Sequence, residues 1–77
     1  MNAKRRKRIM AVANKLDELV ELLMEIREEE QECLDNMPEN LQDSERGQQM
    51  GEAISILEDA ESYIADQSAA LTEIAEG

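Results

Sequence analysis

Pro38 is the only proline of this 77-residue chain, and it interrupts a sequence with helical periodicity on both sides. A helix cannot continue through proline, which lacks a backbone N–H and also pushes the preceding residue away from helical angles. We therefore predict a helix over residues 3–36, a turn over 37–43 and a helix over 44–75. Within the turn, residues 39–42 should form one helical turn, with Leu41 covering the end of the helix pair. Asp43 or Ser44 should cap the second helix.

Apolar residues recur every seven residues in both predicted helices. In the first helix we define a lead row, Ile9, Leu16, Leu23 and Met37, and a companion row three residues later, Val12, Leu19, Ile26 and Cys33. In the second helix the lead row is Met50, Leu57, Ile64 and Leu71, and the companion row is Ala53, Ala60, Gln67 and Ile74. This spacing is typical of a coiled-coil seam. A short turn between helices of matched length predicts an all-α, antiparallel two-helix hairpin.

The predicted hairpin leaves apolar residues off its seam. A chain of 77 residues buries little surface alone, and its single cysteine cannot form an internal disulfide. We therefore expect the hairpins to assemble into a dimer or small bundle. The expected oligomer interface consists of Val20, Leu22, Ile54, Ile56 and Tyr63.

Two glycines near the start of the second helix lie four residues apart. Gly47 and Gly51 therefore share one helix face, where a neighbouring backbone could approach closely. The alternative is that both are tolerated near a frayed helix end, since glycine costs about 1 kcal/mol against alanine inside a helix.

Charge is distributed unevenly along the chain. The net charge is −11, and a basic N-terminal segment, residues 1–8, contains the run Lys4, Arg5, Arg6, Lys7 and Arg8. An antiparallel hairpin brings this segment beside Glu73 and Glu76. We favour ion pairing there over pairing with the acidic turn of a second hairpin.

Catalytic chemistry is poorly represented. The chain has no histidine, Cys33 falls on the seam, and no serine has a candidate base. Neighbouring acids in "EIREEEQE" point in different directions on a helix, which disfavours a metal site. We predict no enzymatic activity, no metal and no cofactor.

Two charged segments are the candidate binding sites. An acidic helical rod could imitate the charge of nucleic acid and bind a protein that recognises it, through Glu28, Glu29, Glu32, Asp35 and Glu39. An alternative is a structural or assembly protein without a host target. A further alternative is polyanion binding by Lys4 to Arg8, although the acidic body would repel nucleic acid and no aromatic residue is placed to stack on bases.

The segment "EEEQECLDNMPENLQDSERGQQMGEAISILEDAESYIADQ" resembles a family of small acidic proteins from phages and prophages of gut-type Firmicutes. The shared features are a DN(M/L)PE turn, a helix start like SERG and EAI..LE.A repeats in the second helix. The resemblance implies a phage origin and a helical hairpin, but no site residues. It makes an accessory protein or an inhibitor of host defence the leading hypothesis.

The apolar run at Ile9 to Ala13 is cut by Asn14 and Lys15. It is too short for a signal peptide or a membrane span. We therefore expect no membrane association and a location in the cytoplasm, which for a phage protein is that of the host cell.

Overall fold

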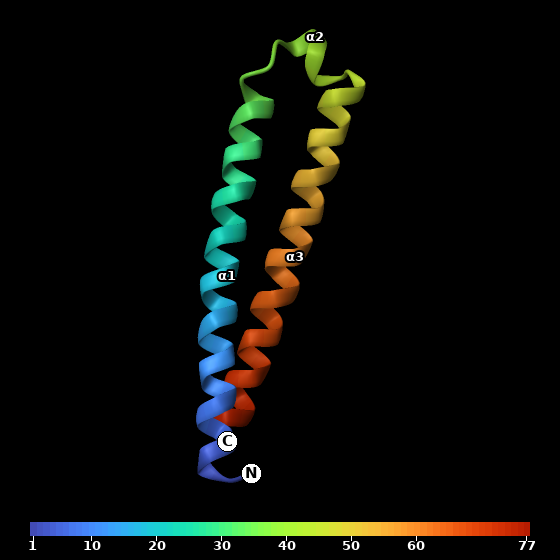
Figure 1. Ribbon diagram of the computed structural model, residues 1–77. Helices are drawn as coiled ribbons and strands as arrows, with labels where there is room; N and C mark the ends of the chain where they lie inside the picture. The colour runs from blue at the N-terminus through green and yellow to red at the C-terminus, as the bar shows by residue number, and fades with distance from the viewer.

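The computed structural model describes residues 1–77 as two long helices joined by a short one (Figure 1). Helix α1 spans Ala3–Asp35, α2 spans Glu39–Gln42 and α3 spans Glu45–Glu76. Helices α1 and α3 run antiparallel along a rod with Cα extents of 58 × 14 × 12 Å. The turn containing α2 closes one end, and both termini lie at the other (Figure 1). The predicted all-α hairpin is confirmed.

Local hydrogen bonds explain where the helices begin and end. Asn2 caps α1, since its side-chain oxygen accepts a hydrogen bond from the Arg5 backbone N–H at 2.8 Å. Pro38 starts α2, and its carbonyl accepts from the Leu41 N–H at 2.8 Å. Ser44 caps α3, because its Oγ accepts from the Gly47 N–H at 3.3 Å and donates to the Leu41 carbonyl. Of the two predicted caps, the structure therefore uses Ser44.

The two glycines differ in their surroundings. Gly47 is buried where α3 meets the end of α2. A Cβ there would overlap the Gln42 carbonyl oxygen and lie 2.9 Å from the Leu41 carbonyl oxygen. A Cβ on Gly51 would meet nothing within 4 Å. Close backbone approach is thus confirmed for Gly47 only. Leu41 does not cover the end of the helix pair, because it is 45% exposed.

The interface between α1 and α3 confirms half of the predicted seam. All lead-row residues are half-buried between the helices. The second row at the interface, however, lies four residues after the lead row, not three. We call this the inner row; it consists of Ala13, Val20, Arg27 and Leu34 in α1, and of Ile54, Glu61, Ser68 and Ala75 in α3.

The companion row of α1 therefore flanks the interface instead of forming it, whereas in α3 the companion row is half-buried at Ala53 and Ala60 and exposed at Gln67 and Ile74. In α1, Val12, Leu19, Ile26 and Cys33 are all exposed. Because each residue turns a helix by about 100°, rows three and four residues later lie on opposite sides of the lead row. Both rows of α1 are largely apolar, so periodicity alone did not separate them. The prediction that Cys33 is a core residue was wrong for this reason.

The core of the hairpin is thin. Only Ala13, Ile54 and Ala75 are buried apolar residues, and no large side chain is fully buried. Ile54, at 6% exposure, and half-buried Val20 belong to the inner row. The hairpin itself covers Ile54, so Ile54 is not free for the predicted oligomer interface, whereas for half-buried Val20 the interface role stays a prediction.

Candidate interaction surfaces

A buried serine joins the two helices near the open end. The Ser68 hydroxyl lies 3.1 Å from the Ala13 carbonyl oxygen and 2.5 Å from Asp17 Oδ1, and both are acceptors for it. Ala13 has a small side chain, which lets the two backbones approach. The buried Ser68 hydroxyl therefore finds hydrogen-bond acceptors on α1. This contact was not predicted from the sequence. Its only signal was that two small residues fall on the same inner row.

One ion pair crosses the middle of the hairpin. Arg27 Nε donates to Glu61 Oε2 at 2.6 Å, and the two side chains are 23% and 12% exposed. The hydrogen bond to Glu61 raises the pKa of Arg27 above its ordinary value, so the guanidinium stays charged. Both residues occupy inner-row positions that apolar residues fill elsewhere. The pair was not predicted from the sequence, because the seven-residue pattern did not place the inner row at the interface.

Both companion rows lie on the same side of the rod. One groove at the turn end is lined by Cys33 of α1 and Arg46 of α3. Arg46 belongs to the α3 companion row, because it lies seven residues before Ala53. This placement is expected, because in both helices the companion row lies three residues after the lead row, and antiparallel packing turns the two companion rows to the same side. Together with neighbouring positions the rows form a surface that we call the apolar face: Val12, Leu19, Leu22, Ile26 and Cys33 of α1, and Ile56, Tyr63, Ala70 and Ile74 of α3.

The apolar face is exposed along the whole hairpin. Ile56 and Tyr63 are each 67% exposed, and Leu22 is also exposed. These three predicted interface residues thus lie on one surface. Basic residues flank it at both ends, since a second groove, at the open end, includes Arg5, Arg8 and Val12.

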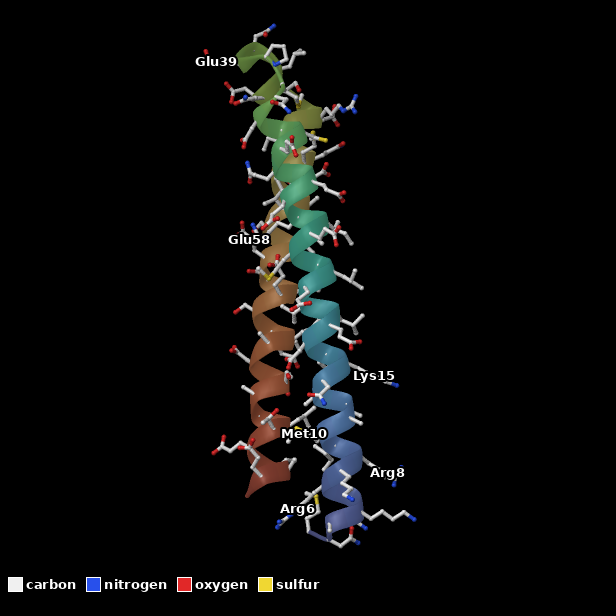
Figure 2. The ribbon with its side chains drawn as sticks, turned by 90° about the vertical axis from the view of Figure 1, so that its left-hand side faces the viewer. Arg6, Arg8, Met10, Lys15, Glu39 and Glu58 are labelled. Atoms are coloured by element: carbon white, nitrogen blue, oxygen red, sulfur yellow. The ribbon has the colours of Figure 1, made fainter.

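Basic side chains gather near the open end of the rod, and acidic side chains predominate along the rest of it. Figure 2 shows Arg8 and Lys15 extending from one side, whereas Glu58 extends from the other. Acids continue along the outward side of α1 in an exposed acidic row at spacings of three and four residues: Glu18, Glu21, Glu25, Glu28, Glu32 and Asp35. Exposed acids on α3 recur every seven residues: Glu45, Glu52, Asp59, Asp66 and Glu73.

The five predicted acidic binding residues do not form one surface. Glu28, Glu32 and Asp35 belong to the acidic row of α1. Glu29 instead lies next to the companion row, seven residues after Leu22, at the edge of the apolar face, where half-buried Glu30 also lines the groove with Cys33 and Arg46. Glu39 lies apart from them in α2, exposed at the turn (Figure 2).

The basic segment has no acidic partner within its own hairpin. The single ion pair of the structure is Arg27–Glu61, so the expected pairing with Glu73 and Glu76 is wrong. Both acids are exposed on outward positions of α3, away from the grooves where Arg5 and Arg8 lie. Arg6 points into the hairpin, and its Nε is buried without a hydrogen-bond partner.

No family model, curated protein or solved structure matches this sequence. The structure contains no group of three or more ligating side chains that could hold a metal ion. Neither long helix has an apolar stretch of the length needed to cross a bilayer. The fold and its surfaces define an antiparallel helical hairpin with acidic outward sides and an apolar face.

Proposed function

We propose that this protein is a non-enzymatic accessory or inhibitor protein of phage type that binds a host protein through the acidic row of α1. The observation that carries the proposal is the acidic row of α1. Its carboxylates recur about every 5 Å along the helix axis, at 1.5 Å per residue. One strand of B-DNA carries a phosphate about every 3.4 Å. The linear charge density of the row is therefore comparable to that of a nucleic-acid strand.

The acidic row is available for such binding. Its residues are exposed, and none of them takes part in an ion pair within the hairpin. A rigid rod of like charges attracts a basic cleft over long range, which speeds association and makes it sensitive to salt. The partner best suited to this surface is a protein whose basic cleft normally holds nucleic acid, such as a host defence nuclease.

A matched pair of variants tests this proposal. Glu18→Gln, Glu25→Gln and Glu32→Gln together neutralise the acidic row of α1. Glu52→Gln, Asp59→Asn and Asp66→Asn change the net charge by the same amount on α3. Each protein would be used to capture proteins from nuclease-treated host cytoplasm at low and high salt, and the affinity of any captured nucleic-acid-binding protein would then be measured.

We expect the α1 variant to weaken that affinity at least tenfold and the α3 variant to weaken it less than threefold. A short DNA duplex should compete with the wild-type protein for the same partner. Equal effects of the two variants, or binding that persists in high salt and in excess duplex, would contradict nucleic-acid mimicry by the acidic row.

The apolar face favours a second candidate function, in which the hairpins serve as a structural or assembly element without a host target. In that case both charge variants would assemble normally, and neither would capture a host protein. Polyanion binding by Lys4 to Arg8 is a third candidate, supported by the absence of acidic partners for this segment. Neutralising these residues would abolish retention on a DNA column only under that third function.

A further inference from the structure

We propose that the apolar face binds a second copy of this chain in antiparallel orientation. The product is a four-helix bundle in which the open end of one hairpin lies beside the turn of the other. This inference does not rest on the proposed function, because the acidic row lies on the outward side of α1, beside and not within the apolar face, and stays exposed in the dimer.

The hairpin alone leaves too much apolar surface in water. Ten large apolar side chains are exposed by 40% or more, and no large side chain is fully buried. A face 58 Å long and two helices wide, at about 10 Å per helix, covers roughly 1,000 Å². Stable complexes bury about 800 Å² per partner. The apolar face is therefore large enough for a stable dimer.

The residues of α1 are arranged symmetrically about Leu19. Val12 and Ile26 each lie seven residues from it on the companion row. Consider two hairpins whose apolar faces lie against each other, with a two-fold axis in the plane between the faces. If the axis runs perpendicular to the rod at the height of Leu19, it packs α1 of one copy against α1 of the other. It places Leu19 against Leu19 of the second copy, and Val12 against Ile26 of the second copy. The face is thus complementary to itself, as a two-fold interface requires.

The same axis also produces matching contacts on α3. Ser68 of α3 contacts Ala13 and Asp17 and therefore lies beside this part of α1. Because the two helices run antiparallel, Ala65, three residues before Ser68, lies at about the same height along the rod as Leu19. Ile56 and Ile74 each lie nine residues from Ala65, on opposite sides. The axis therefore brings Ile56 close to Ile74 of the second copy. Two helices with different sequences give symmetric apolar pairs about one centre.

Charge selects the antiparallel orientation. Arg8 and Glu29 lie roughly 15 to 17 Å from Leu19 on opposite sides. The two-fold axis brings each Arg8 beside Glu29, an acid at the edge of the face, on the second copy. It also places the basic segment Lys4 to Arg8, which has no acidic partner in its own hairpin, beside the acidic turn of the second copy. A parallel dimer would place basic segment against basic segment and acidic turn against acidic turn.

Cysteine cross-linking tests the centre of this register. The variants are made in a Cys33→Ser background, and this background protein should sediment at about twice the 8.7 kDa chain mass. The Leu19→Cys variant should then form an intermolecular disulfide rapidly under mild oxidation. The Glu25→Cys variant, with its thiol on the acidic row, is the matched control and should cross-link at least tenfold more slowly. Far-ultraviolet circular dichroism of the same samples checks that both variants remain helical.

A mixture of two variants tests the register away from the centre. Val12 and its counterpart in the second copy lie about 20 Å apart along the axis, too far for a disulfide, and so do the two Ile26 residues. The Val12→Cys and Ile26→Cys variants should therefore cross-link after refolding together, and neither should cross-link alone. A parallel dimer, or a different register, would not reproduce this pattern.

A charge swap tests the contact between Arg8 and Glu29. Either Arg8→Glu or Glu29→Arg should raise the dissociation constant of the dimer about two- to thirtyfold, because each dimer contains the contact twice. The double variant should return it close to the wild-type value. A wild-type chain that sediments at monomer mass at 100 μM (about 0.9 g/L), or Leu19→Cys cross-linking no faster than the control, would overturn the proposal.

Discussion

At the scale of single residues, the turn depends on one position without a side chain. Gly47 sits where the backbone of α3 passes the carbonyls at the end of α2, whereas Gly51 faces open space. Gly47→Ala should lower the free energy of unfolding by about 1 to 3 kcal/mol, because the Cβ must displace backbone. Gly51→Ala should raise it by up to about 1 kcal/mol through helix propensity.

Urea unfolding followed by circular dichroism, at one fixed protein concentration, compares these two variants with the wild type. Gly51→Ala is the control for glycine replacement in the same helix. If Gly47→Ala were as stable as Gly51→Ala, the close approach of α2 and α3 would not exist in solution.

At the scale of the helices, the Arg27–Glu61 pair is the one ion pair that distinguishes the observed register from a slip of seven residues, alongside the hydrogen bond from Ser68 to Asp17. Apolar and small residues repeat along both rows, so a slipped hairpin would still bury similar surface. A half-buried polar pair contributes little net stability but can specify one arrangement. We infer that this pair holds α1 and α3 in register.

Leucine substitution separates register from stability. Glu61→Leu alone should destabilise the hairpin, because it leaves Arg27 at the interface without its acceptor. The double variant Arg27→Leu with Glu61→Leu should be more stable than that single variant, yet adopt more than one register. Amide NMR spectra would show additional peaks for the double variant. A single set of peaks would mean that other contacts specify the register.

At the scale of the whole molecule, repulsion among carboxylates opposes folding. The net charge is −11, and only one ion pair offsets the acids of the two long helices. Raising NaCl from 10 mM to 500 mM shortens the screening length from about 30 Å to about 4 Å. The melting temperature should therefore rise, by about 4 to 8 °C for each 1 kcal/mol gained.

Thermal unfolding at several salt concentrations measures this effect. The triple variant that neutralises Glu18, Glu25 and Glu32 should show a smaller rise, because part of the repulsion is already removed. A melting temperature that fell with added salt would show that attraction between opposite charges outweighs repulsion in the folded protein.

The parts of the fold that depend on neighbouring residues were predictable from the sequence. Pro38 ended α1, residues 39–42 formed a helical turn, and Ser44 capped α3, each within one residue of the predicted position. These features depend on backbone hydrogen bonds over a few residues. The errors at Cys33 and Ile54 concern contacts between helices, which a single helical pattern does not define.

The sequence by itself determined a hairpin of two amphipathic helices, because Pro38 and the seven-residue repeat act locally. Only the tertiary structure decided which apolar row of α1 meets α3. The inner row forms the interface because Ala13 and Ser68 are small enough for the backbones to approach, and the Ser68 hydroxyl donates to the Ala13 carbonyl. On the same row, Arg27 forms an ion pair with Glu61. That choice turned the companion row of α1 outward and created the apolar face.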